Sequence, residues 1–414
     1  MGGVKRVYVL TNGCPENRID AARMLEFLKH NGWKISDSYR SADLILFNTC
    51  GHTQGSEESS LRIIRHINAT KDPSARFIVC GCLTKINLQR LREIYGGEIF
   101  GSDDIQSLGR FVRTEFNTDL IQANYLVPSE KISMVTGRYL KKWSNLWSLR
   151  AIAQQFARAY MIRLNEIINV FRPHTFCIKV STGCLSACSY CAIRQSRGRL
   201  HSKHSNHVKR EFEEGLRQGK KEFALIGTDL GAYGRDLGTD LVELLKELVG
   251  FGGEYSIRLR NIHPKFLIEM MPRLCEVLHS GRIAYLSTAV ESGSDRILKA
   301  MNRGYTIEQY KEAIRTLNKE FPDIEIRTQF MVGFPGEKEE DFQASLRVLD
   351  EVSIDYVEIY EFEARPNTIA ERMEDQVPRR VVKKRALQLL LKSLFNERER
   401  RRKAIQRYRN FRKR

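Results

Sequence analysis

Three closely spaced cysteines after a strand-like run constrain this chain more than any other feature. Residues 176–181 have the short apolar pattern of a strand, and Cys184, Cys188 and Cys191 follow in a CxxxCxxC array. Thiolates are soft ligands that suit iron–sulfur clusters and zinc. A structural zinc site takes four ligands, whereas this loop offers three with no fourth cysteine nearby. We therefore expect a four-iron cluster with one iron left open to bind a small molecule.

The second half of the chain has the pattern of an open barrel. Helical stretches separate most of six strand candidates, which are 176–181, 222–228, 254–260, 282–290, 324–332 and 356–362. Six βα units in about 190 residues fit a partial (β/α)6 barrel better than a closed barrel of eight units. The cysteine loop follows the first of these strands, at the face where barrel active sites lie.

The first 115 or so residues also alternate strand and helix. Strand-like runs at 5–12, 42–49 and 76–81 are followed by helical patterns at 16–30, 57–68 and 83–93. This alternation is typical of a doubly wound α/β domain with a parallel sheet.

Three dispersed cysteines stand at matching places in this first domain. Cys14 follows the first strand, Cys50 ends the second and Cys82 ends the third. The carboxyl ends of parallel strands line the ligand crevice of an open sheet, so we expect the three thiols to converge on one site. The alternative is that they are buried core thiols, which is a common place for cysteine.

The barrel motifs resemble those of the radical S-adenosylmethionine (SAM) superfamily. The array TGCLSACSYC at 182–191 has the superfamily spacing, and an aromatic residue precedes its last cysteine. The resemblance implies that the open iron binds the amino and carboxylate groups of SAM, whose reductive cleavage gives a 5′-deoxyadenosyl radical. It also implies SAM contacts at or near strand ends, namely Tyr190, Gly227, Thr228, Asp229, Glu291, Ser292, Gly333 and Phe334.

The first domain narrows the resemblance to one family. NGCPEN at 12–17, NTC at 48–50 and CGC at 80–82 are similar to motifs of the methylthiotransferases that modify tRNA or ribosomal protein. The resemblance implies a flavodoxin-like domain whose Cys14, Cys50 and Cys82 hold an auxiliary 4Fe–4S cluster. One SAM would methylate a sulfur at this cluster, and a second would give the radical that activates an unreactive C–H of the substrate. The cofactors would carry the difficult chemistry, so no side-chain general base is required.

The sequence departs from that family in two places. The C-terminal β-barrel (TRAM) domain has no counterpart, because only a helix and a basic tail follow the barrel, and Glu291 stands where the family often has Gln. We expect four parts: an N-terminal domain at 1–119, a helical connector at 120–172, the barrel at 173–375 and a basic helical tail at 376–414. The connector and the tail are basic, so one hypothesis is that they replace the substrate contacts of the missing domain. The alternatives are that the connector is an amphipathic packing helix, which we prefer, and that the tail is a solvated terminus.

Charge and composition indicate a polyanionic partner. The net charge is +18, and the tail from 398 to 414 is rich in Lys and Arg, which favours RNA. Arg194, Arg197 and Arg199, after the cluster loop, are candidates for contact with a substrate phosphate. No apolar run approaches the roughly 20 residues needed to span a bilayer, and the first residues have no signal-peptide pattern. We therefore expect a cytoplasmic enzyme.

Three readings of function follow, in order of preference. The first is a methylthiotransferase that modifies a tRNA adenosine derivative near the anticodon, with a separate electron donor as partner. The second is the same chemistry on a protein or ribosomally made peptide. The third is a non-catalytic iron–sulfur protein, which would not cleave SAM.

Overall fold

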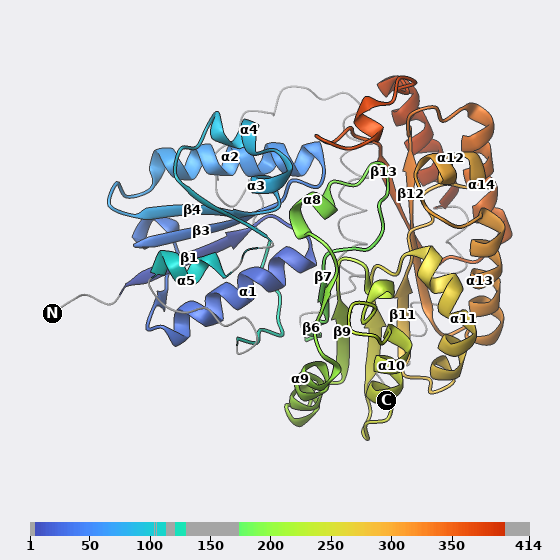
Figure 1. The fold of residues 1–414 in the computed structure, drawn as a ribbon, viewed down its shortest axis with the longest axis horizontal. Coiled ribbons are helices and arrows are strands. Elements are labelled where there is room, and N and C mark those ends of the chain that lie inside the picture. Colours follow the sequence, from blue (N-terminus) through green and yellow to red (C-terminus); the bar gives the residue numbers. More distant parts are fainter. Residues whose placement is uncertain (1–4, 103, 105, 113–120, 130–173, 394–414) are drawn as a thin grey trace.

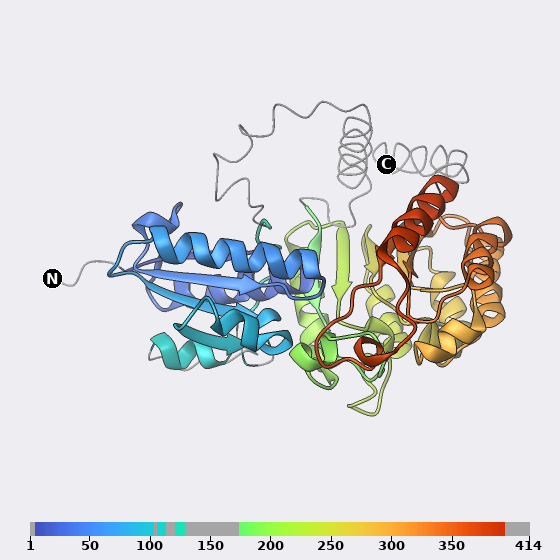
Figure 2. The same ribbon diagram turned by 90° about the horizontal axis from the view of Figure 1, so that it is seen from above.

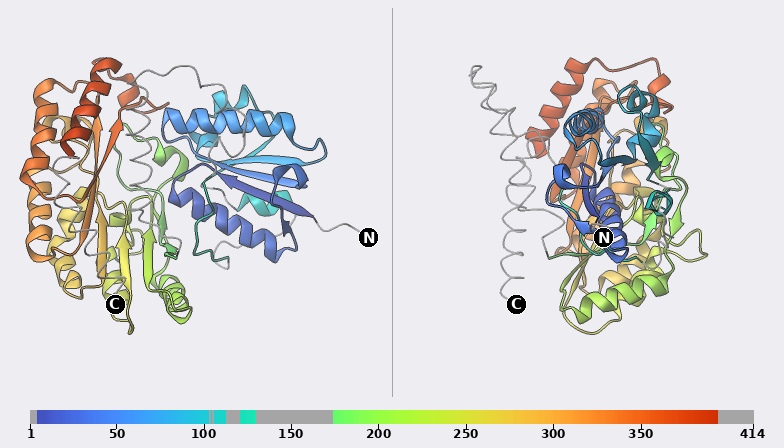
Figure 3. Two further views of the ribbon diagram at one scale, coloured as in Figure 1. Left: turned by 180° about the vertical axis from the view of Figure 1, so that it is seen from behind. Right: turned by 90° about the vertical axis from the view of Figure 1, so that its left-hand side faces the viewer.

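Two parallel β-sheets, one in each half of the chain, form the framework of the computed structural model (Figure 1). The structure describes residues 5–102, 104, 106–112, 121–129 and 174–393. The two halves lie side by side, with the N-terminal domain against the edge of the barrel that carries its first strand (Figures 1 and 3).

The N-terminal sheet has the strand order β2-β1-β3-β4-β5, and every neighbouring pair is parallel. This is the flavodoxin-type order of a doubly wound fold and confirms the predicted fold of this domain. The strands are β1 (Arg6–Thr11), β2 (Lys34–Ile35), β3 (Leu44–Thr49), β4 (Arg76–Gly81) and β5 (Glu98–Gly101). The helices are α1 (Pro15–His30), α2 (Gln54–Thr70), α3 (Leu83–Ile86), α4 (Leu88–Arg92) and α5 (Ser107–Val112), and the short η1 (Tyr39–Ser41) precedes β3.

Both faces of this sheet are covered, as the apolar run of β3 requires. Leu44 and Leu46 pack with α1 and α5 on one face, while Ile45 and Phe47 pack with α2 and α4 on the other. All six residues of β3 are buried, which is the pattern of a strand inside a parallel sheet with helices on both sides. The carboxyl ends of β1, β3 and β4 lie together at the end of the sheet that faces the barrel.

One predicted helix of this domain is divided. The pattern at 83–93 forms α3 and α4, separated at Asn87, whose backbone is not helical (φ −144°, ψ 65°). The Asn87 side chain accepts a hydrogen bond from the Arg90 backbone nitrogen at 3.3 Å, so Asn87 caps the second helix. Strands β2 and β5 were not predicted, because each is short.

The barrel sheet has six parallel strands in the order β13-β12-β11-β10-β9-β6. The strands are β6 (Phe176–Lys179), β9 (Glu222–Ile226), β10 (Ser256–Leu259), β11 (Ile283–Ser287), β12 (Glu325–Val332) and β13 (Tyr356–Glu361). They match the six predicted strands, and they confirm an open barrel. A small antiparallel pair, β7 (Ser181–Thr182) and β8 (His201–Ser202), was not predicted.

Helices cover the outer side of the barrel sheet (Figures 1 and 2). They are α9 (Ser205–Arg217), α10 (Leu241–Val249), α11 (Pro264–Leu278), α12 (Asp295–Ala300), α13 (Ile307–Glu320) and α14 (Glu339–Glu351). Two of their starts show clear capping: Thr306 and Gln309 form a capping box at α13, and the Asp240 carboxylate caps α10, which satisfies amide groups that have no partner within the helix. The remaining short helices are α8 (Ile193–Arg197), η3 (Leu230–Ala232) and η4 (Ala370–Arg372).

The connector and the tail lie partly outside the described residues. Within the connector, Ala123 and Val127 pack into the N-terminal core, and the Asn124 carbonyl accepts a hydrogen bond from the Cys177 nitrogen at 2.9 Å. Within the tail, residues 379–393 are helical, and Val382 and Leu389 belong to the barrel core. Substrate contacts predicted for 130–172 and 398–414 concern residues that the structure does not describe. None of the described helices has the length and apolar character needed to cross a bilayer.

Candidate active site between the two domains

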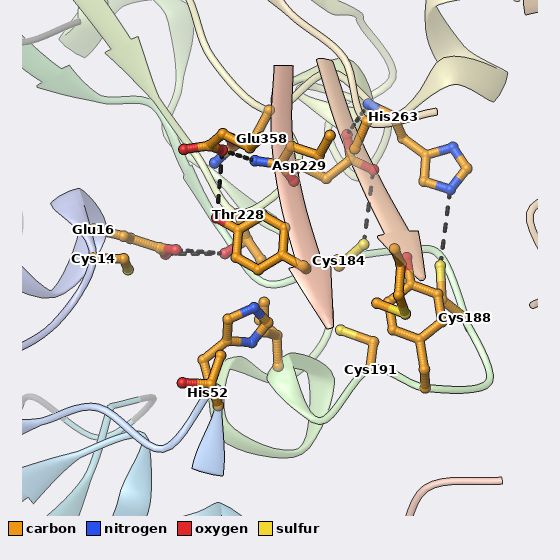
Figure 4. Close-up of a pocket in the computed structure, with 18 of the residues that line it drawn as sticks. Cys14, Glu16, His52, Cys184, Cys188, Cys191, Thr228, Asp229, His263 and Glu358 are labelled. Atoms are coloured by element: carbon orange, nitrogen blue, oxygen red, sulfur yellow. Dashed lines mark hydrogen bonds between the residues drawn. The ribbon is translucent and has the colours of Figure 1, made fainter. Parts of the chain in front are cut away.

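A cavity of about 650 Å³ lies between the N-terminal domain and the barrel, and all six predicted ligand cysteines line it. Figure 4 shows Cys14 on one side and Cys184, Cys188 and Cys191 on the other. In both sheets the cysteines follow the carboxyl ends of parallel strands, where open α/β sheets and barrels build their sites. The structure therefore brings the two cysteine sets to opposite walls of one cavity.

Three neighbouring strands bring Cys14, Cys50 and Cys82 together. They follow β1, β3 and β4, which are adjacent in the sheet. The sulfur atoms of Cys14 and Cys82 lie 3.9 and 3.6 Å from the same atom, Asn17 Oδ1. Cys50 is buried, and burial and the nearby Cys82 thiol raise its pKa. The predicted convergence at strand ends thus accounts for the positions of all three thiols.

The CxxxCxxC loop is contacted by polar side chains from the segments that follow β9, β10 and α12. The sulfur of Cys184 lies 3.7 Å from Asp229 Oδ2, and that of Cys188 lies 3.9 Å from His263 Nε2 (Figure 4). The Cys188 sulfur also lies 3.3 Å from Arg303 Nη1. Gly183, just before the loop, has φ +78°, and a Cβ there would lie 2.0 Å from the Arg199 carbonyl oxygen. Only glycine fits this entry to the loop.

The residues of both sites fit four-iron clusters. All nine cysteines are free thiols. Burial raises the pKa of Cys184 to about 12 and that of Cys191 to about 11, so these groups become thiolates only when metal replaces the proton. Among the described residues, no three Cys, His, Asp or Glu side chains gather as closely as a single ion requires. A four-iron cluster takes one thiolate per iron, so its ligands stand further apart.

Half of the eight predicted SAM contacts line the cavity, namely Tyr190, Thr228, Asp229 and Glu291. Asp229 accepts hydrogen bonds from the backbone nitrogens of Gly231 at 3.1 Å and His263 at 3.2 Å. Burial raises the pKa of Asp229 to about 6. These groups form the barrel wall beside the CxxxCxxC loop.

The other four predicted SAM contacts lie behind this wall. Gly227 follows β9, and Ser292 is fully buried. Gly333 has φ +80° and its nitrogen donates to Glu337 Oε2 at 2.7 Å. The ring of Phe334 lies 6.4 Å from that of Tyr190, centre to centre. None of these four is among the residues that line the cavity, so their contact with SAM stays a prediction.

The three arginines after the cluster loop have different environments. Arg194 is exposed and lines the cavity, whereas Arg199 is exposed outside its wall. Arg197 is buried, and its Nη1 lies 2.5 Å from Asp20 Oδ2. Arg197 also lines the cavity, so its contact with a substrate phosphate stays a prediction, although a carboxylate of the N-terminal domain already pairs with its guanidinium.

Several cavity residues were not predicted, namely His52, Arg260, His263, Arg303, Arg327, Glu358 and Tyr360. Arg260 directly follows β10, and His263 caps α11 just beyond it. Arg327 on β12 pairs with Glu358 on β13, which also accepts a hydrogen bond from Gln329 Nε2 at 2.8 Å. Arg260, His263 and Tyr360 stand on or past the carboxyl halves of barrel strands, so the rule that located the cysteines also points to them. Arg327 and Glu358 lie in the first halves of their strands, where the rule gives no signal.

Comparison with known proteins agrees with this arrangement. The Radical SAM superfamily model matches residues 178–349, and the family described as Uncharacterized protein family UPF0004 matches residues 6–100. The chain is 30% identical to a probable threonylcarbamoyladenosine tRNA methylthiotransferase from Pyrococcus horikoshii, over 92% of this chain and 82% of that protein. It belongs to the radical SAM methylthiotransferases.

Two further methylthiotransferases match to a similar extent. The threonylcarbamoyladenosine tRNA methylthiotransferase MtaB of Thermotoga maritima is 31% identical, over 92% of this chain and 80% of its own. The ribosomal protein uS12 methylthiotransferase RimO of Thermotoga sp. (strain RQ2) is 30% identical, over 93% and 83%. The relatives thus include enzymes named for tRNA and for ribosomal protein.

The fold is shared with solved radical SAM enzymes. The methyltransferase TsrM from Kitasatospora setae, at 13% identity, has a TM-score of 0.58 over 88% of this chain and 75% of its own. The cobalamin-dependent enzyme OxsB, at 14% identity, has a TM-score of 0.52 over 95% of this chain and 56% of its own. At these identities the likeness concerns the fold alone.

Family membership decides between the classes of function considered above. The methylthiotransferase is a SAM-dependent enzyme that transfers a sulfur-containing group, and its cofactors are SAM and two 4Fe–4S clusters. When bound, these groups supply the radical and sulfur chemistry. The reading as a non-catalytic iron–sulfur protein is therefore set aside.

Proposed function

We propose that this methylthiotransferase modifies a threonylcarbamoyl-bearing adenosine of tRNA, near the anticodon, by replacing a C–H with a methylthio group. Two of the relatives above are named for this substrate. The net charge of +18 suits a polyanionic partner such as RNA. Since tRNA would be the substrate, we place the reaction in the cytoplasm.

The observation that carries the proposal is the guanidinium group of Arg260 on the barrel side of the cavity. Arg260 follows β10 and lines the cavity, next to Arg327 of β12, which is paired with Glu358. Burial lowers the pKa of Arg260, and the positive charge of Arg327 lowers it further. A bound anion would relieve both effects. A threonylcarbamoyl group ends in a carboxylate, and guanidinium groups bind carboxylates with paired hydrogen bonds.

We assign the remaining site residues by their positions. Cys14, Cys50 and Cys82 hold the auxiliary cluster, and Cys184, Cys188 and Cys191 hold the radical cluster. Tyr190, Thr228, Asp229 and Glu291 contact SAM, and Gly227, Ser292, Gly333 and Phe334 shape that wall from behind. Arg194, exposed at the cavity, and Arg199 near it are suited to phosphates of a bound RNA.

The position of the cavity between the two domains defines what the protein itself does. The barrel wall places SAM against the CxxxCxxC loop, and the opposite wall presents the N-terminal cysteine segments. An electron donor must supply the radical cluster, and we expect a separate protein in that role. We retain the division at 119, 172 and 375, with the basic connector and tail as further RNA contacts.

One experiment tests the substrate. The reconstituted enzyme is incubated anaerobically with SAM, reductant and either tRNA or ribosomal protein uS12, and the products are digested and analysed by mass spectrometry. We expect a methylthio gain on the threonylcarbamoyladenosine nucleoside, and none on the matched tRNA that lacks the threonylcarbamoyl group. A gain on uS12 alone would contradict the proposal and favour the protein substrate, in line with the RimO relative.

A further inference from the structure

Polar contacts join the cysteine side of the N-terminal domain to the barrel at three places. Arg365 reaches the Cys50 segment, Arg197 reaches α1 after Cys14, and Ser196 contacts Ser102, whose hydroxyl lies near the Cys82 sulfur. These contacts connect positions far apart in sequence, and they surround the cavity that holds both sets of cysteines. Beside them, Cys82 packs with Ala192, the residue that follows Cys191.

The contact at Cys50 is a buried arginine. Arg365, which lies beyond β13, donates from Nη2 to the carbonyl oxygen of Gly51 at 2.7 Å and pairs with Glu57 of α2. The side chains of Arg365 and Glu57 are 6% and 2% exposed. Gly51 directly follows Cys50, so the barrel fixes the backbone next to this cysteine. Close by, Glu363 Oε2 accepts a hydrogen bond from the Gln54 nitrogen at 2.6 Å.

The contact at Cys14 runs through the first turns of α1. Arg197 Nη1 lies 2.5 Å from Asp20 Oδ2, and Arg197 also binds Asn17. Lys179 on β6 lies 2.6 Å from Asp20 Oδ1. In addition, the Thr228 hydroxyl lies 3.0 Å from the carboxylate of Glu16. All of these groups are buried or partly buried, and α1 begins directly after Cys14.

The contact at Cys82 involves the same helix as that at Cys14. The Ser102 hydroxyl donates to the Ser196 carbonyl oxygen at 2.6 Å and lies 3.9 Å from the Cys82 sulfur. Ser196 and Arg197 both belong to α8, which begins two residues after Cys191. One short helix therefore links the end of the CxxxCxxC loop to two of the three N-terminal cysteine segments.

We propose that Arg365 is a positioning residue that couples the two cluster sites, so that it controls methylthio transfer but not SAM cleavage. A buried ion pair adds little net stability compared with apolar packing, which favours a role in fixing the register of the two domains. SAM cleavage requires the barrel wall alone. Transfer requires that sulfur delivered from the N-terminal site meet a substrate in the cavity, and a displacement of about 1 Å can cost about 100-fold in rate.

The inference rests on the family's chemistry and not on the identity of the substrate. It uses the ratio of two products, 5′-deoxyadenosine and methylthiolated substrate, which can be measured with whichever of tRNA or uS12 the enzyme modifies. Failure of the proposed tRNA substrate would leave this ratio measurable. The two proposals can therefore fail separately.

Arg365→Gln in the full-length, reconstituted enzyme is the test. Glu57 keeps Arg90 at 2.8 Å and Asn87 at 3.0 Å, so its carboxylate stays compensated and the domain stays folded. We expect iron content and substrate-free SAM cleavage within about twofold of wild type, with methylthiolated product per 5′-deoxyadenosine lowered about 10- to 100-fold. Arg365→Lys, which keeps the charge, should restore part of the ratio.

Arg385→Gln is the matched control. Arg385 is also 6% exposed, and it contacts both the carboxylate and the backbone carbonyl of Glu337, at 2.8 and 3.0 Å. Both residues belong to the barrel side and lie outside the cavity wall. The control variant should leave the product ratio unchanged, because its ion pair does not connect the two domains.

Hydrogen exchange gives a readout that does not depend on activity. In the reconstituted Arg365→Gln enzyme, the amides of residues 50–57 should exchange faster than in wild type, and in Arg385→Gln they should not. An unchanged product ratio in Arg365→Gln would overturn the proposal. A parallel loss of iron or of SAM cleavage would also overturn it, since Arg365 would then support the fold in general.

Discussion

The hydroxyl of Tyr190 donates a hydrogen bond to Glu291 Oε1 at 2.9 Å. This contact joins the residue just before the third cysteine of the CxxxCxxC loop to the segment that follows β11. Glu291 is buried and has φ +65°, a left-handed conformation that its surroundings must maintain. Arg303 Nη1 lies 3.3 Å from the same hydroxyl. One phenol oxygen thus connects the CxxxCxxC loop to Glu291 and to Arg303.

Tyr190→Phe should destabilise the chain through this contact. Removal of the hydroxyl leaves the buried Glu291 without its donor, which costs about 1 to 3 kcal/mol of the free energy of unfolding. Urea unfolding of the cluster-free chain measures this loss. Tyr125→Phe is the control. The Tyr125 hydroxyl also donates to a carboxylate, Glu26, at 2.6 Å, but Tyr125 is 41% exposed. Equal losses in the two variants would contradict the role assigned to Tyr190.

Asp20 should make stability depend on pH in the acidic range. Burial alone would raise the pKa of Asp20, but Lys179 and Arg197 lower it from 3.8 to about 2. A carboxylate whose pKa is lower in the folded chain than in the unfolded chain stabilises the fold at any pH above the unfolded-state pKa. This contribution to the free energy of unfolding, here about 2 kcal/mol, is lost as the pH falls through the folded-state pKa. The stability difference between wild type and Asp20→Asn should hold between about pH 7 and pH 5 and shrink between about pH 4 and pH 2. A difference that does not change with pH would contradict this.

Gly183→Ala should disrupt the cluster loop and not merely strain it. Gly183 and Gly219 have similar φ values, +78° and +72°. A Cβ atom added at Gly183 would lie 2.0 Å from the Arg199 carbonyl oxygen, whereas a Cβ atom added at Gly219 would have no neighbour within 4 Å. Gly219→Ala should therefore cost only the left-handed strain of about 1 to 2 kcal/mol. Gly183→Ala should in addition lose about four irons per chain. Full iron content in this variant would refute the loop geometry.

Arg260→Gln should weaken substrate binding more than turnover. If Arg260 binds the substrate carboxylate, loss of this charged hydrogen bond should raise the KM for tRNA about 10- to 100-fold. Arg273→Gln is the control, because that arginine forms a half-exposed ion pair with Asp240 at 2.6 Å on the outer surface. Steady-state kinetics decides, and an unchanged KM in Arg260→Gln would remove Arg260 from the substrate site.

Both sheets and the cysteine sites could be predicted because they follow from local rules. The apolar run of β3 and the six barrel strands are visible as patterns, and the ends of parallel strands converge by topology. The division of the predicted helix at Asn87 could not be predicted, because it depends on the backbone conformation of that one residue. Strand β2, with two exposed residues, has no apolar signal.

The contacts between the domains could not be predicted. Arg365 meets Gly51 across 314 positions of sequence, and neither neighbourhood indicates a partner. For the same reason the pairing of Arg197 with Asp20 could not be predicted: in the sequence Arg197 is one of three similar arginines, and only the docking of α1 against the barrel gives it Asp20.

Iron bound per chain is the most direct test of the central claim that two three-cysteine sites face one cavity. The wild-type enzyme, reconstituted anaerobically, should bind about eight irons, and the variant with Cys14, Cys50 and Cys82 all replaced by Ala should bind about four. Cys275→Ala, outside the cavity wall, should keep the wild-type value. About four irons in the wild type, or no loss in the triple variant, would contradict the account.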